Sequence, residues 1–264
     1  MTGSKVFLRG RGLLTLLLLG AVALSASAID WSGPVAHTGG GGAALRFFRS
    51  MLSPDLSPGF LKLALKASWY TVAYAVAGMT LALALGVPLG IVASGTLART
   101  ARLRYPMMVG TRLFLGAIRS VHELVWAWLL VVAIGLSPMA AVIALAVPYA
   151  GILGRIYSEL LNDVPHEPLQ ALRSTGASEL KVLLYGRLPM ALPDMVSYTF
   201  YRFECAIRAA AIMSFVGIAG LGYQIQLSLA DLLFDQVWTL LFFLVVLVLA
   251  VDAWSGRVRR SMTR

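Results

Sequence analysis

The sequence predicts an all-α, polytopic membrane protein with about six transmembrane helices. Of its 264 residues, 59% are hydrophobic and only 13% are charged, whereas a soluble domain carries about 25% charged residues. The apolar residues fall in runs of about 17 or more, which is the length that crosses a bilayer. Basic residues gather in the short segments between these runs, as the positive-inside rule describes for cytoplasmic loops.

The first apolar run, Leu13 to Ile29, follows a basic start and ends in small residues. That composition is typical of a signal peptide, but the run is also just long enough to span the bilayer. Retention as an anchor helix and cleavage are therefore both open. Either outcome leaves the segment that follows outside the cytoplasm. We expect residues 1–62 to form this amino-terminal anchor and outer segment.

Five further apolar runs follow the outer segment. Glycine, proline or charged residues mark their boundaries, as is typical of turns and loops. We assign residues 63–254 to a transmembrane domain and residues 255–264 to a basic cytoplasmic tail. The five runs cover residues 63–97, 105–136, 138–161, 189–216 and 237–254.

The distribution of Lys and Arg indicates the orientation of these spans. The amino end, the loop near residue 100, the stretch 155–187 and the carboxyl tail carry most of the basic residues. The turn near Pro138 and the loop 217–236 carry none. Both termini are therefore predicted to lie in the cytoplasm. The exceptions, on the outer side, are Arg46, Arg49, Lys62 and Lys66.

Several functional classes are disfavoured by composition and motif content. The net charge of +10 is explained by membrane orientation, so we expect no nucleic-acid partner. A single cysteine, Cys205, forms no intrachain disulfide, and the three histidines are scattered, so no metal site is expected. The sequence has no phosphate-binding loop of the G-x-x-x-x-G-K-[ST] type. Nor does it hold a nucleophile with a matched base, and we expect no catalysis and no cofactor in this chain.

The stretch 162–189 is the most specific part of the sequence. Two prolines at its start favour entry into a short helix, because proline is tolerated in a first helical turn. Gly176 then allows the backbone to turn or a partner to approach closely. The alternative is a plain cytoplasmic loop with surface helices. The residues that carry the pattern are Gln170, Ala171, Leu172, Gly176, Ala177, Leu188 and Pro189.

This pattern resembles the EAA loop of ABC importer permeases, which docks on a partner ATPase. In that loop Glu-Ala-Ala is followed by three residues, Gly, nine residues and Ile-x-Leu-Pro. Gln170 replaces the usual Glu, so the resemblance implies docking but not a charged contact at that position. Gly186 stands where Ile is common. Two further segments, Arg119 to Trp126 and Ser197 to Glu204, look like segments of phosphonate-type permeases.

The resemblance covers roughly residues 65 to 254 and implies a type I ABC importer permease fold in the bacterial cytoplasmic (inner) membrane. It implies import of phosphonate, phosphite, hypophosphite or phosphate. The implied partners are two ATPase subunits that hold ATP and Mg, a second permease copy in a homodimer, an extracytoplasmic substrate-binding protein and membrane lipid. Two alternatives are open: a permease for methionine, molybdate or glycine betaine, and an integral membrane enzyme or scaffold.

Ionisable side chains inside the predicted spans form a candidate translocation path. A charge at the bilayer centre costs at least about 2.5 kcal/mol, so these groups should face protein or a water-filled route. In one interpretation, Arg119–Glu123 and Glu204–Arg208 are ion pairs four residues apart that lock helices together. In the other, the excess of arginine lines the route of an anion, since arginine's forked donors suit an oxyanion. The candidates are Arg119, His122, Glu123, Arg202, Glu204 and Arg208.

Overall fold

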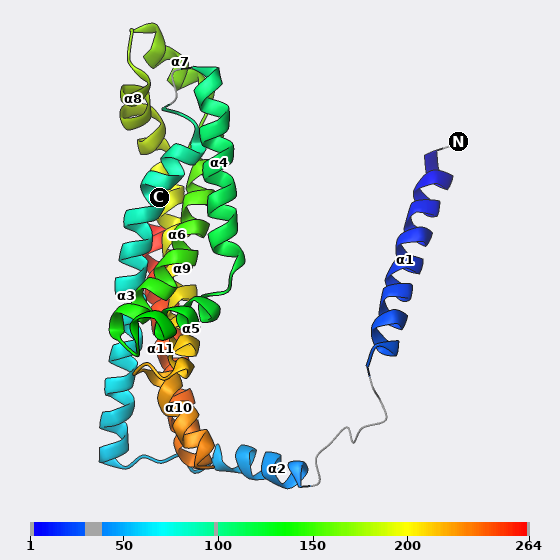
Figure 1. Cartoon of the computed structure of the whole chain (residues 1–264), viewed down its shortest axis with the longest axis vertical. Helices are drawn as coiled ribbons and strands as arrows, with labels where there is room; N and C mark the ends of the chain where they lie inside the picture. The colour runs from blue at the N-terminus through cyan, green and yellow to red at the C-terminus, as the bar shows by residue number, and fades with distance from the viewer. Residues whose placement is uncertain (1–2, 30–38, 98–99, 263–264) are drawn as a thin grey trace. The chain divides into compact units, whose positions relative to one another are not determined.

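The computed structural model describes residues 3–29, 39–97 and 100–262. Helices make up nearly all of these residues (Figure 1). The chain divides into two compact units, Met1–Phe48 and Arg49–Arg264. The prediction of an all-α membrane protein is therefore confirmed for the described residues.

The first unit carries the first apolar run on a single helix. Helix α1 spans Gly3–Ser27, and all of its large apolar side chains from Leu13 to Leu24 are exposed. Helix α2, Gly40–Ser50, begins in this unit and ends in the second. The described apolar part of α1, Gly12–Ser27, is shorter than a full membrane span.

The second unit contains the other helices (Figure 1). A π-helical turn, η1, precedes α9, and a short 3-10 helix, η2, follows it. The helices are α3 Pro58–Ser94, α4 Ala101–Ser120, α5 Glu123–Ile134, α6 Pro138–Asp163, α7 His166–Ser174, α8 Glu179–Val182, η1 Leu183–Arg187, α9 Leu188–Met213, η2 Ser214–Val216, α10 Leu221–Ala230 and α11 Phe234–Met262.

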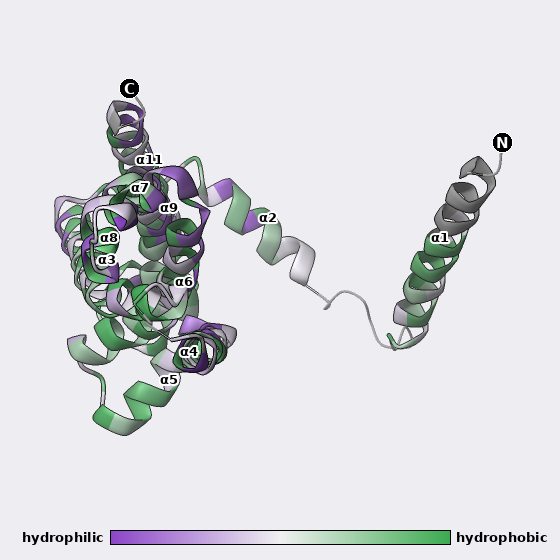
Figure 2. Cartoon of the chain, turned by 90° about the horizontal axis from the view of Figure 1, so that it is seen from above, coloured by the Kyte–Doolittle hydropathy of each residue, from purple (hydrophilic) through white to green (hydrophobic). Residues whose placement is uncertain are grey.

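Among the described residues, α3, α6 and α11 are each long and apolar enough to cross a membrane alone. Two bent pairs also qualify when each is taken as one span. Helix α4 meets α5 at 83°, and the stretch that contains α9 meets α10 at 44°. Three to five spans are thus present in the described part, by length and composition. Helix α5 is apolar beyond Glu123 in its first turn (Figure 2).

Helices α3 and α6 form the centre of the second unit through small residues. A Cβ atom added at Gly90 of α3 would lie 3.0 Å from the carbonyl oxygen of Gly154 on α6. One added at Gly86 would lie 3.1 Å from the Cβ of Leu153. Small residues allow helix backbones to approach this closely in membranes. The pair therefore forms a tightly packed base for the other helices.

The run 105–136, predicted as one span, is divided into two helices that meet at 83°. Helix α4 ends at Ser120 and α5 begins at Glu123, with Val121 and His122 in extended conformations. The Nδ1 atom of His122 accepts a hydrogen bond from the backbone N–H of Leu124 at 3.2 Å, which caps the new helix. The residues at the break, Arg119, Ser120, His122 and Glu123, are polar, but the apolar residues beyond them let the whole run pass as one span.

Candidate functional site

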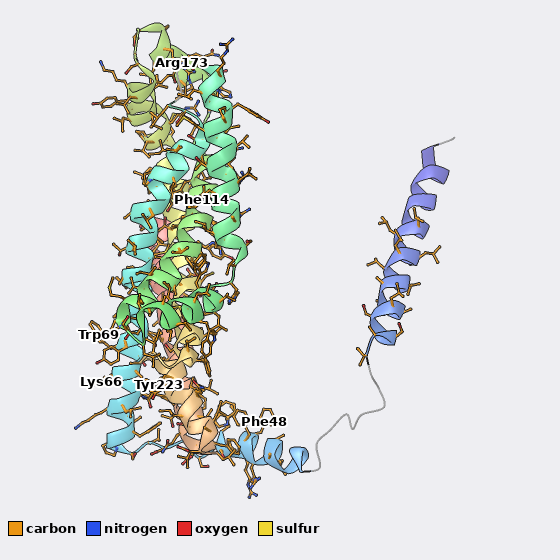
Figure 3. All side chains as sticks on the ribbon, viewed as in Figure 1. Phe48, Lys66, Trp69, Phe114, Arg173 and Tyr223 are labelled. Carbon is orange, nitrogen blue, oxygen red and sulfur yellow. The ribbon has the colours of Figure 1, made fainter. Side chains whose placement is uncertain are left out.

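Residues 162–189, named here the coupling region, lie at one end of the second unit, where Figure 3 labels Arg173. Helix α7 packs on the unit through Leu169, which is fully buried, and Leu172, which is half-buried. Gln170 and Ala171 are exposed on the same helix. The region thus has an anchored apolar side and an accessible side.

The backbone turns at Gly176, where φ is +81°. This left-handed conformation favours glycine because a side chain would crowd the backbone. Across the turn, Arg173 donates two hydrogen bonds of 2.9 Å to the carboxylate of Glu179. These bonds raise the pKa of the Arg173 guanidinium above its usual value. The ion pair joins α7 to α8 on either side of the turn.

Gly186 has a structural reason to differ from the usual isoleucine. A Cβ atom at this position would lie 2.8 Å from Leu172 Cδ1 and 2.9 Å from Leu169 Cδ2. Such contacts are shorter than side chains accept without a shift. The missing side chain therefore allows α7 to lie directly against the π-helical turn η1.

Arg187 is a residue that the sequence analysis did not single out. Its side chain is buried, and its Nη1 atom donates to the carbonyl oxygen of Leu161 at 2.8 Å. The Nδ2 atom of Asn162 donates in turn to the carbonyl oxygen of Ser94 at 3.3 Å. These bonds satisfy carbonyls at the ends of α6 and α3, which have no partner within their own helices. The sequence feature that could have indicated this role is the position of Arg187 directly before the Leu188-Pro189 pair.

In the membrane part, three of the predicted path residues, from two helices, are electrostatic neighbours of one tyrosine. The hydroxyl of Tyr149 on α6 lies within electrostatic range of Glu123 on α5 and of Arg202 and Arg208 on α9. We name Glu123, Tyr149, Arg202 and Arg208 the Tyr149 cluster. Tyr149 was not among the predicted site residues, since a tyrosine in an apolar run is by default a packing residue.

Neither intrahelical ion pair of the first interpretation forms among the described residues. Glu204 pairs instead with Arg259 of α11, whose Nη2 lies 3.0 Å from Glu204 Oε1. Arg119 and Glu123 do not pair because the break at residues 121–122 puts them on different helices. Glu123 contacts His122, with Nε2 and Oε1 3.7 Å apart. A spacing of four predicts a pair only where no other helix offers a partner.

The remaining arginines differ in how they are held. Arg202 donates to the hydroxyl of Tyr198 at 2.8 Å, and its guanidinium lies 5.6 Å from the ring centre of Tyr201. Arg119 is exposed and makes no ion pair within the described residues. Arg208 is also exposed, with Nη2 3.5 Å from Cys205 Sγ. Among the candidate path residues, Glu204 is already paired with Arg259. Glu123 is therefore the acidic residue of that set that remains to balance its three arginines.

Chemically, this arrangement suits attraction of an anion. Arginine remains charged at all relevant pH values and presents forked donors to oxyanions. In the described part of the chain, no group of three or more His, Cys, Asp or Glu side chains could hold a metal ion.

The family described as "Binding-protein-dependent transport system inner membrane component" matches residues 86–264. The chain belongs to this family. The match covers the coupling region and the Tyr149 cluster. Predictions of a permease, of an inner-membrane location and of a subunit distinct from the ATPase are confirmed by this membership and by the relatives below.

Two curated relatives extend this family assignment. The phosphite transport system permease protein PtxC of Stutzerimonas stutzeri is 31% identical over 72% of this chain and 68% of its own length. The phosphate-import permease protein PhnE of Mycolicibacterium smegmatis is 31% identical over 74% of this chain. The match covers only 36% of that relative's length.

A solved structure supports the fold of this binding-protein-dependent permease. An inward-facing structure of the MetNI methionine ABC transporter matches with a TM-score of 0.70. The match covers 79% of this chain and 100% of that chain at 22% sequence identity. The predicted importer permease fold is therefore confirmed.

Proposed function

We propose that this chain is the membrane-spanning permease subunit of an ATP-driven importer for a phosphorus oxyanion. The observation that carries the proposal is the similarity to permeases named for phosphite and phosphate, each 31% identical. Relatives named for D-methionine and for glycine betaine are 26% and 24% identical. Phosphonate, phosphite, hypophosphite and phosphate share the tetrahedral anionic group that defines the cargo class.

The coupling region is proposed as the docking element for two ATPase subunits, which bind ATP and Mg. Gln170, Ala171 and Gly176 are exposed and offer a surface to a partner. Leu169 and Leu172 hold α7 against the membrane unit from the other side. Movement of an ATPase docked on the exposed side of α7 is therefore transmitted to η1 through the direct contact at Gly186.

The same movement reaches the membrane helices through Arg187. Its hydrogen bond to Leu161 links η1 to the end of α6, and Asn162 links that end to α3. Helices α3 and α6 then move as one body because their glycines hold them in close contact. Two permease copies in a homodimer would open outward when the ATPases close on ATP, and reset after hydrolysis. This is two-state alternating access driven by a ligand of another chain.

The Tyr149 cluster and Arg119 are proposed to line the route of the anion delivered by an extracytoplasmic binding protein. Arg119 and Arg208 are exposed in the single chain, and exposed charges in a membrane require water or a protein partner. Arg202 is held by Tyr198, which favours a fixed positive field over direct capture. The paired ions Glu204 and Arg259 serve instead to hold α11 to α9.

Reconstitution tests the proposal directly. The chain is purified with its ATPase and placed in proteoliposomes, and ATP-dependent uptake is measured with the binding protein outside. Phosphonate, phosphite, hypophosphite and phosphate are compared with methionine and glycine betaine. Uptake of at least one phosphorus oxyanion, and of neither comparison solute, is expected. Uptake of methionine or betaine alone would overturn the assignment of cargo. Failure of any ATPase to copurify would overturn the assignment as a permease.

A further inference from the structure

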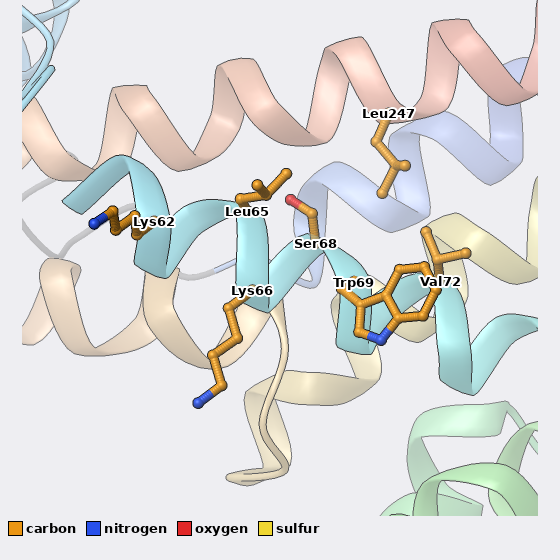
Figure 4. Close-up of a pocket in the computed structure, with 7 residues that line it drawn as sticks. All are labelled: Lys62, Leu65, Lys66, Ser68, Trp69, Val72 and Leu247. Atoms are coloured by element: carbon orange, nitrogen blue, oxygen red, sulfur yellow. The ribbon is translucent and has the colours of Figure 1, made fainter. Parts of the chain in front are cut away.

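A groove runs between α3 and α11, towards the opposite end of the second unit from the coupling region (Figure 3). Its volume is about 570 Å³, within the range of about 300–1,000 Å³ of small-molecule sites. The walls are mostly apolar, and Figure 4 shows Leu247 of α11 facing the α3 side chains. The apolar wall residues are Leu65, Trp69, Val72 and Leu247.

Two cations stand on the part of the groove that lies nearest the start of α3. Lys62 and Lys66 are both exposed and one helical turn apart (Figure 4). Neither forms an ion pair with any residue that the structure describes. The Nζ atom of Lys66 lies 5.9 Å from the ring centre of Tyr70. The carboxylate of Asp55, seven residues before Lys62, instead accepts a hydrogen bond from the backbone N–H of Ser57.

The length of α3 puts these lysines at the level of lipid headgroups. The 28 residue steps from Lys66 to the helix end at Ser94 rise about 42 Å at about 1.5 Å per residue. A complete bilayer with its headgroups is about 40–45 Å thick. Trp69 is 70% exposed just inside this level, where tryptophan is enriched at the membrane interface.

We propose that this groove is a binding site for an anionic phospholipid of the outer leaflet. The headgroup phosphate lies between Lys62 and Lys66, and one acyl chain lies along Trp69 and Val72 towards Leu247. The site explains why two lysines stand on the side of the membrane where basic residues are disfavoured. The lysines can extend towards the headgroups while their methylene stems cover apolar surface.

Lipid fits the groove better than other occupants. A free oxyanion would use the lysines but leave the apolar walls empty, since it has no apolar part. A binding protein would cover the helix ends, whereas the walls continue along α3 as far as Val72. A phospholipid has a phosphate at one end and long apolar chains at the other. The groove has its lysines at one end and its apolar walls beyond them, so the two match along their length.

The test uses Trp69 as a reporter inside the site. The full-length chain, purified with its partner subunits in detergent, is titrated with phosphatidylglycerol or phosphatidylcholine brominated in the acyl chains. Bromine quenches tryptophan fluorescence on contact, and subtraction of the signal from a Trp69→Phe variant isolates Trp69. Quenching of Trp69 is expected at a clearly lower concentration of phosphatidylglycerol than of phosphatidylcholine.

Substitution of the lysines tests whether Lys62 and Lys66 bind the lipid headgroup. Lys62→Gln and Lys66→Gln are each expected to raise the half-quenching concentration of phosphatidylglycerol about fivefold, with little effect on phosphatidylcholine. Arg102→Gln, the same charge change on the exposed start of α4, is the matched control and should leave both titrations unchanged.

Three results would overturn the proposal. Equal quenching by the two lipids would show an annular contact without headgroup recognition. Reversal of phosphatidylglycerol quenching by millimolar inorganic phosphate would indicate a free-anion site. No quenching of Trp69 by either lipid would show that a second copy or another subunit covers the groove.

Discussion

The coupling region and the Tyr149 cluster differ in how Arg187 and Arg208 are held. In the coupling region, Arg187 is buried and donates to the helix-end carbonyl of Leu161, and Arg173 is held by Glu179 at 2.9 Å. In the membrane part, Arg208 is exposed, and its Nη2 atom lies 3.5 Å from the sulfur of Cys205. Satisfied cations stiffen a structure, whereas exposed cations attract a mobile anion. The same residue type therefore has two proposed roles in this chain, to transmit force between helices and to line the path of an anion.

The largest expected effect comes from the membrane side of this comparison. Arg208→Gln should lower oxyanion uptake about 10- to 100-fold, because a hydrogen bond to a charged group contributes about 1.5–3 kcal/mol. The melting temperature should hardly change, since the side chain is exposed. Uptake in proteoliposomes and thermal unfolding measure the two quantities. Arg257→Gln on the exposed last part of α11 is the control of equal charge, and equal uptake by both variants would remove Arg208 from the path.

Arg187→Met should show the reverse pattern. It leaves the Leu161 carbonyl without its donor, and an unsatisfied buried polar group costs about 1–3 kcal/mol. We expect a lower melting temperature and, in the assembled complex, ATP hydrolysis that no longer drives uptake. Arg187→Lys should recover part of the stability. A variant with unchanged unfolding and normal uptake would contradict the proposed link between η1 and α6.

Gly186→Ile restores the residue that is common in the family but should impair this chain. The new side chain meets Leu169 and Leu172, and overpacking costs about 1–3 kcal/mol. We expect α7 to shift and binding of the ATPase to weaken, as measured by copurification. Gly256→Ile, where a Cβ has no neighbour within 4 Å, is the matched control. Unimpaired copurification of Gly186→Ile would show that α7 does not need this close contact.

The smallest effect is expected from the surface ion pair. Glu179→Gln removes the charge that holds Arg173 across the Gly176 turn, and an exposed pair contributes at most about 1 kcal/mol. Thermal unfolding at low and high salt should show a small difference that salt removes. A loss much larger than this would mean that the pair, and not the apolar contacts of α7, holds the coupling region together.

Much of this architecture follows from local composition. The apolar runs predicted the positions of α1, α3, α6, α9 and α11, because burial in lipid requires continuous apolar length. The spacing of Gly176, Leu188 and Pro189 indicated the coupling region, and the structure has its turn at Gly176 with φ +81°. These features depend on residues close together in the sequence, so the sequence by itself determined them.

The tertiary structure decided the contacts between distant segments. Glu204 pairs with Arg259, which lies 55 residues further along the chain, and Arg187 binds a carbonyl 26 residues before it. Neither contact has a periodic signal, since it depends on which helix ends meet. The break at residues 121–122 is likewise undecided by the sequence, because the polar residues around it are compatible with one long helix or with two. Helix packing selects among such equivalent local patterns, so only the folded chain determines which charges remain free.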